Sequence, residues 1–433
     1  MKKWCLVNFL FYFLIVTAQN QYQTYTNPVL VPGNFNGTNI NSTADPHVFQ
    51  DTDGTYYMYV TGNGYPCFSS RDLVNWTYEK KVFTGSNRKW AVQGFWAPEV
   101  IKIGEKYYLH YTAGREDNIK HIGVAVANHP TGPFVDVNDY PFIDNGAKGT
   151  IDSHVFIDDD GKTYMYYSNA MSTNPVPEWG GKKRSEIWVV EIQPDFSGFL
   201  SEPVMLIYPQ QNWEYKTSSN QYWNEGAVVL KNNGMYYLIF SANCYCAANY
   251  AVGYATSTSP MGPFTKSPGN PILSNSGVSH AVSGPGHNSV VRGPDGESWY
   301  FVYHSHVHVG NLNSDNSGIR QVNIDRMFFN HDGTMSVSGP SITPQPYPVV
   351  SGVSNARYQN LRIYPSVVEN ELIIDHNIHN PEAMLTVNSI LGHSLRFPVQ
   401  SHSTIDLSGL PTGIYQVSLT DGTQQYRSKI LKK

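Results

Sequence analysis

Five stretches of the chain repeat one pattern of hydrophobic and polar positions. In the clearest copy, Asn224–Ser241, an apolar run (Ala227–Leu230) meets the turn Asn232-Asn233-Gly234 and then an aromatic and β-branched run (Met235–Phe240). Two such runs around a tight turn are the sequence signal of a β-hairpin. The other copies are Asp45–Thr61, Ala97–Thr112, Asp152–Ser168 and His287–Ser305. Five copies predict five equivalent structural units.

Shorter apolar stretches between the hairpins predict further strands in each unit. Gly123–Phe134 and Val252–Phe264 share a Pro-x-Gly-Pro-Phe turn, and Phe68–Phe83, Ile187–Phe199 and Ile319–Phe329 take the same place in the other units. Each unit then holds about four strands, the content of one propeller blade. We therefore predict an all-β fold with a five-bladed β-propeller over residues 19–345.

The two ends of the chain differ from the repeats. Residues 1–18 combine Lys2 and Lys3 with an apolar stretch and a small-residue site at Ala18, which is typical of a secretory signal peptide. No other segment is predicted to span a membrane. Proline-rich sequence ends the repeats, and we place a linker at 346–358. Alternating strands and glycine turns predict a small β-sandwich domain at 359–433.

The composition narrows the class of partner. Charged residues make up 15% of the chain and the net charge is −5, so nucleic acid is not an expected partner. The 30 tyrosines suit neutral, hydroxyl-rich ligands, although strand propensity alone also enriches tyrosine. For Cys67, Cys244 and Cys246 we favour partly buried thiols over a bridge from Cys67 to one of the other two.

Aligning the repeats on their first apolar pair places five residues in one column, directly before the first strand. They are Asp45, Ala97, Asp152, Glu225 and His287. Because propeller blades surround one axis, we expect this column to meet at one mouth of a central channel. Three carboxylates in one column, each beside an apolar strand, favour a functional site over solvated charges.

Carboxyl groups in this arrangement suit the hydrolysis of a glycosidic bond, which uses one acid for the leaving oxygen and one base or nucleophile. Asp45 precedes Pro46, which we expect to favour an extended backbone at Asp45, and its short carboxylate suits the base that activates water. Glu225 follows Trp223, and an apolar wall would raise its pKa as a general acid requires. Asp152 is then the third member, which orients the acid.

Six motifs around these residues together resemble glycoside hydrolase family 43: ADPHVF, WAPEV, DSHVF, NEG, GPGHNSVV and GIRQVNIDRMFF. The resemblance covers about Asn27–Pro346. It implies a five-bladed propeller that hydrolyses with inversion, with Asp45 as base, Asp152 as pKa modulator and Glu225 as acid. The carboxyl separation should then leave room for a water. No cofactor is required for this chemistry.

The resemblance also implies roles for residues around the carboxylates. His287 matches a channel histidine that contacts a water-ligated calcium ion in arabinan-cleaving members; a histidine hydrogen-bonded in the channel is the alternative. Arg320 matches an arginine that binds sugar hydroxyls, with a structural salt bridge as the alternative. Trp96 and Trp223 are candidates for stacking on a sugar, and blade-to-blade packing would also explain them.

The last 75 or so residues resemble the C-terminal sorting domain of the bacterial type IX secretion system. The pattern IYPSVVENELIID, NSILGHSL and IDLSGLPTGIYQVSL, closed by a lysine-rich strand, carries this resemblance. It implies passage across the outer membrane with the type IX machinery as partner, and a secreted or cell-surface location. A plain accessory module is the alternative.

We therefore expect a secreted glycosidase that cleaves α-L-arabinofuranosyl linkages in plant cell-wall arabinan or arabinoxylan. Activity as a β-xylosidase or endo-arabinanase of the same family is the alternative. A non-catalytic carbohydrate-binding propeller is a second class, but a binding site needs no acid matched to a base. A protein-interaction propeller would instead present a broad apolar face.

Overall fold

The computed structural model describes residues 24–169, 180–215, 221–275, 281–308, 315–330 and 332–348, and, further along, 362–364, 367–375, 383–389, 394–400, 403–421 and 424–433. The chain divides into two compact units, Met1–Val349 and Val350–Lys433. The predicted signal peptide and linker lie outside the described residues, apart from the linker's first three positions. Within the described part, no helix is long and apolar enough to cross a bilayer.

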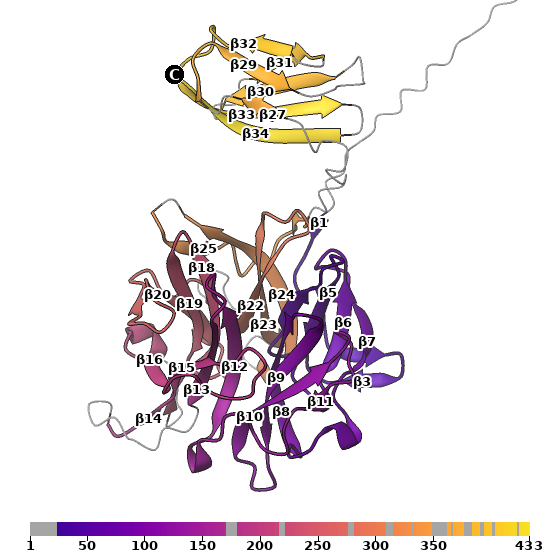
Figure 1. Ribbon diagram of the computed structural model, residues 1–433, viewed down its shortest axis with the longest axis vertical. Helices are drawn as coiled ribbons and strands as arrows, with labels where there is room; N and C mark the ends of the chain where they lie inside the picture. Colours follow the sequence, from indigo (N-terminus) through magenta and orange to yellow (C-terminus); the bar gives the residue numbers. More distant parts are fainter. Residues whose placement is uncertain are drawn as a thin grey trace, which may run out of the picture. The chain divides into compact units, whose positions relative to one another are not determined.

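The first unit contains, among its described residues, five antiparallel sheets of four strands, each built from strands in chain order (Figure 1). The first three are β4 (His47–Gln50), β5 (Tyr56–Tyr59), β6 (Pro66–Ser70) and β7 (Thr77–Lys81); β8 (Gln93–Ile103), β9 (Lys106–Gly114), β10 (Lys120–Ala127) and β11 (Val135–Asp136); and β12 (Thr150–Ile157), β13 (Thr163–Asn169), β15 (Glu186–Ile192) and β16 (Val204–Ile207). The last two are β18 (Asn224–Asn232), β19 (Met235–Ala242), β20 (Ala251–Ser257) and β21 (Thr265–Lys266); and β22 (Gly286–Arg292), β23 (Trp299–His308), β24 (Asp315–Phe329) and β25 (Met335–Val337).

The first strands of the five sheets form a closed ring. Each contacts the first strands of two neighbouring sheets, in the order β4, β8, β12, β18, β22 and back to β4. The five sheets are therefore the blades of a propeller, and the predicted fold class is confirmed.

Side chains on both faces of the blades are buried, which explains the nearly continuous apolar runs in the sequence. In β5, Tyr56 and Met58 pack in a cluster with strands of the fifth blade, whereas Tyr57 and Tyr59 pack against the second blade. Successive strand residues point to opposite faces, so a strand between two blades needs apolar residues at consecutive positions. Burial between neighbouring blades thus holds the ring together.

Short elements complete the first unit. Before the first blade, Leu30 bridges Val322 of β24, so the lead-in packs on the fifth blade and joins it to the first. The short strands are β1 (Thr24–Tyr25) with β26 (Gln345–Pro346), β2 (Gly33–Phe35) with β3 (Thr38–Ile40), and β14 (Lys183–Arg184) with β17 (Gln221–Tyr222). Among the described residues, 3₁₀ turns lie at Gly85–Asn87, Gly146–Lys148 and Asn212–Tyr215.

The second unit packs two sheets on one apolar core, as predicted for a β-sandwich. Leu372 and Ile374 of one sheet share this core with Leu385 and Val417 of the other. One sheet is β27 (Arg362–Tyr364), β29 (Glu371–Asp375) and β32 (Ser403–Asp406). The other is β28 (Val367–Val368), β34 (Gln424–Lys432), β33 (Gly413–Asp421), β30 (Met384–Ser389) and β31 (Ser394–Pro398).

The prediction of free thiols is confirmed for Cys67 and was wrong for Cys244 and Cys246. Cys244 and Cys246 form a disulfide, whereas Cys67 is a buried thiol. The chain turns at Tyr245 and brings the Cα atoms of the two cysteines to 5.0 Å, within the reach of a disulfide. A bridge across a single residue was not among the pairings that the sequence suggested.

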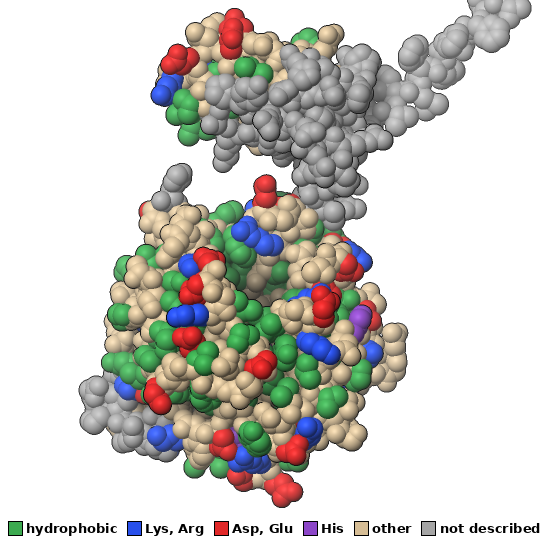
Figure 2. Space-filling model, in the orientation of Figure 1, with side chains coloured by type: hydrophobic (Ala, Val, Ile, Leu, Met, Phe, Trp, Pro, Cys, Tyr) green, Lys and Arg blue, Asp and Glu red, His purple; other side chains and the backbone are tan. Residues whose placement is uncertain are grey.

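One face of the molecule is mixed in charge. Figure 2 shows Lys and Arg side chains beside Asp and Glu on the visible face, without a continuous patch of one sign. This face therefore offers no basic surface for nucleic acid.

Candidate active site

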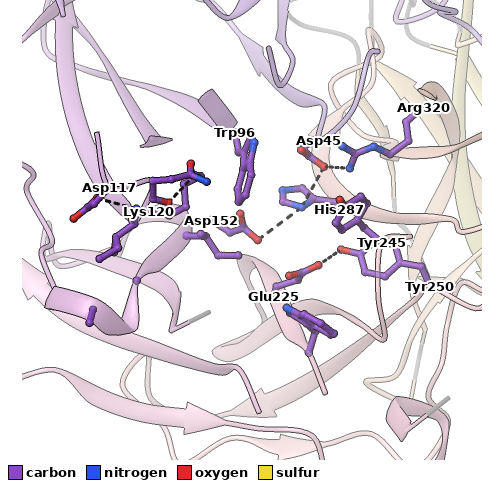
Figure 3. Close-up of a pocket in the computed structure, with 16 residues that line it drawn as sticks. Asp45, Trp96, Asp117, Lys120, Asp152, Glu225, Tyr245, Tyr250, His287 and Arg320 are labelled. Atoms are coloured by element: carbon purple, nitrogen blue, oxygen red, sulfur yellow. Dashed lines mark hydrogen bonds and ion pairs between the residues drawn. The ribbon is translucent and has the colours of Figure 1, made fainter. Parts of the chain in front are cut away.

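All seven predicted site residues line one cavity of about 470 Å³ in the propeller. They are Asp45, Trp96, Asp152, Trp223, Glu225, His287 and Arg320. The other residues that line it, which the sequence did not single out, are Asp117, Asn118, Ile119, Lys120, Ala147, Gly149, Ile151, Tyr245 and Tyr250. Side chains far apart in the sequence thus converge, as Figure 3 shows for the labelled residues.

In the fourth blade, the residue at the equivalent position is Gly226 and not the predicted Glu225. One residue at the start of each blade has a left-handed backbone: Asp45 (φ 52°), Ala97 (φ 39°), Asp152 (φ 58°), Gly226 (φ 60°) and His287 (φ 47°). The register of the hairpin shifts at these residues in the second to fifth blades. Glu225 therefore lies one place before the column, where the second and third blades have Trp96 and Ile151. The fourth repeat has a longer apolar run, so alignment on its first pair was off by one residue.

In the fourth blade the column position is a glycine, and a side chain there would be crowded by His287. A Cβ on Gly226 would lie 3.2 Å from Nδ1 of His287, and its positive φ disfavours other residues. The backbone N–H of Gly226 donates to Oδ2 of Asp152 at 3.2 Å. Asp152 thus holds the peptide next to Glu225, and the catalytic candidates of two blades are linked.

Polar groups at the ends of the second strands fix the column residues, and sequence reasoning missed them. Each accepts a hydrogen bond from the backbone N–H of the column residue in the next blade: Thr61 from Ala97 (2.8 Å), Thr112 from Asp152 (3.0 Å), Ser241 from His287 (2.9 Å) and His304 from Asp45 (3.2 Å). The sequence signal for these groups was the Thr or Ser near the end of the repeats. In the fifth repeat His304 occupies the equivalent position.

Asp45 is held as a carboxylate. Arg320 donates to its Oδ1 at 3.0 Å, and the hydroxyl of Thr61 donates to its Oδ2 at 2.5 Å. Burial alone would raise the pKa of Asp45, but the positive charge of Arg320 and the nearby His287 outweigh burial and hold the pKa well below its usual range. Arg320 therefore forms a salt bridge, which was the alternative to sugar binding, and its partner is Asp45, the candidate base.

Glu225 lies in the opposite environment. It is 6% exposed, and its pKa is raised to about 7, mainly by burial and also by the charge of Asp45, although a hydrogen bond from Tyr250 and the charge of Arg320 oppose this shift. The Tyr250 hydroxyl donates to Oε1 at 2.8 Å. This leaves Oε2 as the oxygen that can carry a proton for a ligand. Tyr250 is a functional candidate that the sequence did not indicate.

Asp152 and His287 complete the centre. Burial raises the pKa of Asp152, the charges of Glu225 and Asp45 add to this shift, and His287 opposes it. Nδ1 of His287 lies 3.6 Å from Oδ1 of Asp45 and 3.9 Å from Oδ2 of Asp152. One imidazole thus stands between two carboxyl groups.

The tryptophans have different surroundings. Trp96 is 43% exposed, and the ammonium of Lys120 lies 4.5 Å from its ring centroid. An exposed indole in a cavity is available for stacking on a sugar ring. Trp223 lines the cavity too, and its carbonyl accepts a hydrogen bond from the Asn224 amide.

A calcium ion near His287 is implied by the family resemblance. Within the described ranges no group of three or more His, Cys, Asp or Glu side chains is placed to hold a metal ion. The side chains there therefore do not form a metal cage. A calcium ion held largely by water stays a prediction, and no step of the mechanism below uses it.

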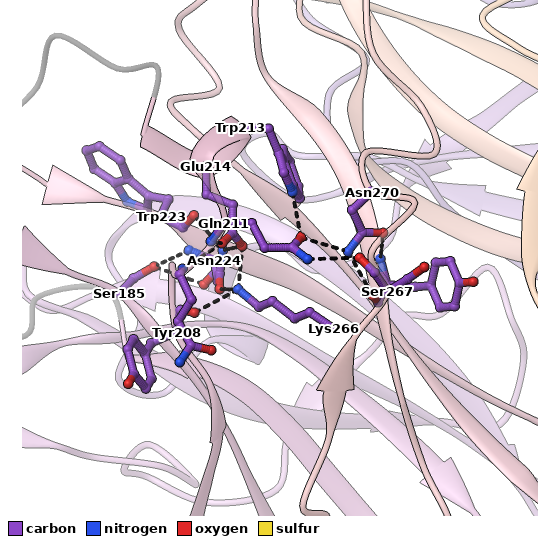
Figure 4. A network of polar contacts seen from close by, with 12 residues as sticks. Ser185, Tyr208, Gln211, Trp213, Glu214, Trp223, Asn224, Lys266, Ser267 and Asn270 are labelled. Atoms are coloured by element: carbon purple, nitrogen blue, oxygen red, sulfur yellow. Dashed lines mark hydrogen bonds and ion pairs between the residues drawn. The ribbon is translucent and has the colours of Figure 1, made fainter.

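A buried polar network supports the strand that carries Glu225 (Figure 4). The ammonium of Lys266 donates to Glu214, to Oδ1 of Asn224 (2.8 Å) and to the carbonyl of Tyr208 (2.7 Å). The Asn224 amide also donates to Glu214 at 2.9 Å. Glu214 is fully buried. The residue before Glu225 is thus held by a largely buried ion pair.

Comparison with known proteins agrees with this geometry. Residues 25–335 match the sequence profile of glycosyl hydrolases family 43, and residues 362–433 match that of the secretion system C-terminal sorting domain. A thermostable family-43 glycoside hydrolase of known structure is 39% identical, with a TM-score of 0.67 over 75% of this chain and 99% of that chain.

Two relatives of known activity are more distant. A β-D-galactofuranosidase of Aspergillus niger is 30% identical over 297 residues, which cover 64% of this chain and 77% of that protein. An arabinoxylan arabinofuranohydrolase of Bacillus subtilis is 27% identical over 295 residues, which cover 62% of this chain and 53% of that protein. The chain thus spans about half the length of the second relative. The profile match over most of the chain, together with the propeller, shows that this chain belongs to glycosyl hydrolases family 43 and carries a type IX secretion sorting domain at its C-terminus.

Proposed function

We propose that the protein is a secreted, inverting enzyme that removes α-L-arabinofuranosyl residues from plant cell-wall arabinan or arabinoxylan. Its family makes it a glycoside hydrolase. The site assignment rests on two carboxyl groups in one cavity whose pKa values are shifted in opposite directions. Asp45 is kept ionised, and Glu225 is kept protonated up to about pH 7. A pair with these properties is what acid–base hydrolysis requires.

The mechanism follows from these protonation states. Asp45 takes a proton from a water molecule, whose oxygen attacks the anomeric carbon. Glu225 gives its proton to the glycosidic oxygen as the bond between that oxygen and the anomeric carbon breaks. Attack and departure on opposite faces invert the anomeric configuration. Solvent exchange then returns a proton to Glu225 and removes one from Asp45. Asp152, through the Gly226 N–H, keeps Glu225 in place.

The choice of sugar rests on the relatives. The Bacillus subtilis protein is an arabinoxylan arabinofuranohydrolase, and the Aspergillus niger protein is a β-D-galactofuranosidase. Both names specify a five-membered sugar ring as the unit removed. Arabinofuranosides are therefore the first candidate substrate and β-D-galactofuranosides the second. Activity as a β-xylosidase or endo-arabinanase is the remaining alternative within the family.

The proposed activity is tested by product analysis. Incubation with linear arabinan, branched arabinan and arabinoxylan should release arabinose, with the inverted anomer appearing first by NMR, whereas xylo-oligosaccharides should release no sugar. Nitrophenyl α-L-arabinofuranoside, β-D-galactofuranoside and β-D-xylopyranoside separate the candidate sugars. Release of xylose alone would overturn the arabinofuranosidase assignment. Binding of the polysaccharides without any sugar release would instead favour a carbohydrate-binding propeller.

The pH dependence gives a second prediction. Asp45 must be ionised, and its lowered pKa places the acid limb of kcat/KM below the ordinary aspartate value of about 4. Glu225 must be protonated, so kcat/KM should fall as the pH rises through about 7. A rate profile on arabino-oligosaccharides checks both limbs. Glu225→Gln should remove the alkaline limb from its residual activity; a limb unchanged in this variant would assign the proton to another group.

The route of export is the last part of the proposal. The sorting domain implies secretion or display at the cell surface. We propose that residues 1–18 direct the first step and that the type IX machinery then moves the chain across the outer membrane.

A further inference from the structure

The loop between β19 and β20 presents a tyrosine that nothing above assigns. Tyr245 lines the cavity and is 47% exposed. Its neighbours on both sides, Cys244 and Cys246, are joined by the disulfide. Their Cα atoms are 5.0 Å apart, whereas two extended steps would span about 7 Å. The bridge therefore closes a turn around Tyr245 alone.

The backbone of this turn is anchored to the fifth blade. Nε2 of His306 donates to the Tyr245 carbonyl at 2.7 Å, and Nδ1 of the same ring lies 3.0 Å from the Ser283 hydroxyl. His306 is fully buried. The disulfide and the buried histidine thus fix the backbone, while about half of the tyrosine remains exposed to a ligand.

The ring stands next to the candidate base. The guanidinium of Arg320 lies 4.8 Å from the centroid of the Tyr245 ring, a cation–π distance. The same guanidinium donates to Asp45. Figure 3 shows Tyr245 on the side of the cavity that carries Asp45 and Arg320. A sugar presented to Asp45 would therefore lie within reach of the Tyr245 ring.

We propose that Tyr245 is a substrate-binding residue that packs on the sugar beside Asp45, and that the Cys244–Cys246 disulfide sets its position. Substrate affinity then depends on oxidation of this pair. The inference rests on the proposed function for the identity of the sugar. Disulfides form outside the reducing cytoplasm, so the enzyme gains full affinity for its substrate only after export.

Kinetics of full-chain variants test this inference. Tyr245→Ala should raise KM about tenfold, the factor that corresponds to about 1.4 kcal/mol for one lost aromatic contact. Its kcat should change by less than about twofold, because binding rather than proton transfer is lost. Tyr245→Phe should keep most of the affinity. The control is Tyr140→Ala, which removes a tyrosine that is 63% exposed and does not line the cavity.

A double-mutant cycle tests whether the disulfide affects substrate affinity through Tyr245. Cys244→Ser with Cys246→Ser should raise KM about three- to tenfold in the unaltered protein, but should raise it no further in the Tyr245→Ala variant, because coupled residues are not additive. Mild thiol reduction of the unaltered protein should raise KM equally, and reoxidation should restore it.

Two results would overturn the inference: an unchanged KM in Tyr245→Ala, or fully additive effects of the disulfide and the tyrosine. Calorimetric binding of arabino-oligosaccharides makes the same comparison without turnover. A protein that binds these sugars through Tyr245 but releases none would contradict the proposed function and uphold the inference.

Discussion

Asp45→Asn is expected to lower kcat about 10²- to 10⁴-fold, the usual contribution of a general base. The amide has nearly the same shape as the carboxylate, so Arg320 and Thr61 keep a partner while the proposed general base is lost. The loss should be of similar size on arabino-oligosaccharides and on nitrophenyl arabinofuranoside, because both reactions need an activated water. Steady-state rates on the two substrates measure it.

Glu225→Gln is the matched comparison, since it removes the proton donor instead. A general acid matters most when the leaving group is a sugar alcohol and least when the leaving group is an acidic nitrophenol. We therefore expect a large loss of kcat on arabino-oligosaccharides and a much smaller loss on the nitrophenyl substrate. Equal losses in Glu225→Gln, or an Asp45→Asn enzyme that keeps its activity, would contradict the assigned roles.

The fold was predictable because its signals are local and repeated. Each hairpin has its own turn residues; Asn233 and Gly234, for example, adopt the positive φ of 50° and 77° that a tight hairpin turn requires. Burial of each blade between two others explains why apolar residues run through consecutive positions of β5. With five copies, a closed ring is the arrangement in which each blade is covered on both faces by its neighbours.

The site was predictable only in part. Repeat register brought Asp45, Asp152 and His287 to one column, but it misplaced Glu225 by one residue because a bulge does not show in an apolar pattern. Tyr250 was missed because its contact with Glu225 depends on the path of the loop before β20. A single residue outside the repeat carries no periodic signal, whatever its role.

The Lys266–Glu214 pair is a further element that the sequence did not reveal, and it carries the second large expected effect. Lys266→Met should lower the free energy of unfolding by about 3–5 kcal/mol, because it leaves the buried Glu214 carboxylate without its partner. Tryptophan fluorescence during urea unfolding measures this for the propeller alone, since all nine tryptophans lie before residue 300.

Three comparisons make the test specific. Lys89→Met breaks an exposed pair with Asp139 and should change stability by less than about 1 kcal/mol. Lys266→Met combined with Glu214→Gln should recover part of the loss, because no unpaired charge remains buried. Lys266 also holds Asn224, the residue before Glu225, so the single variant should lose kcat even under conditions where it is fully folded. If Lys266→Met is no less stable than Lys89→Met, the buried pair does not hold the strand that presents Glu225 to the substrate.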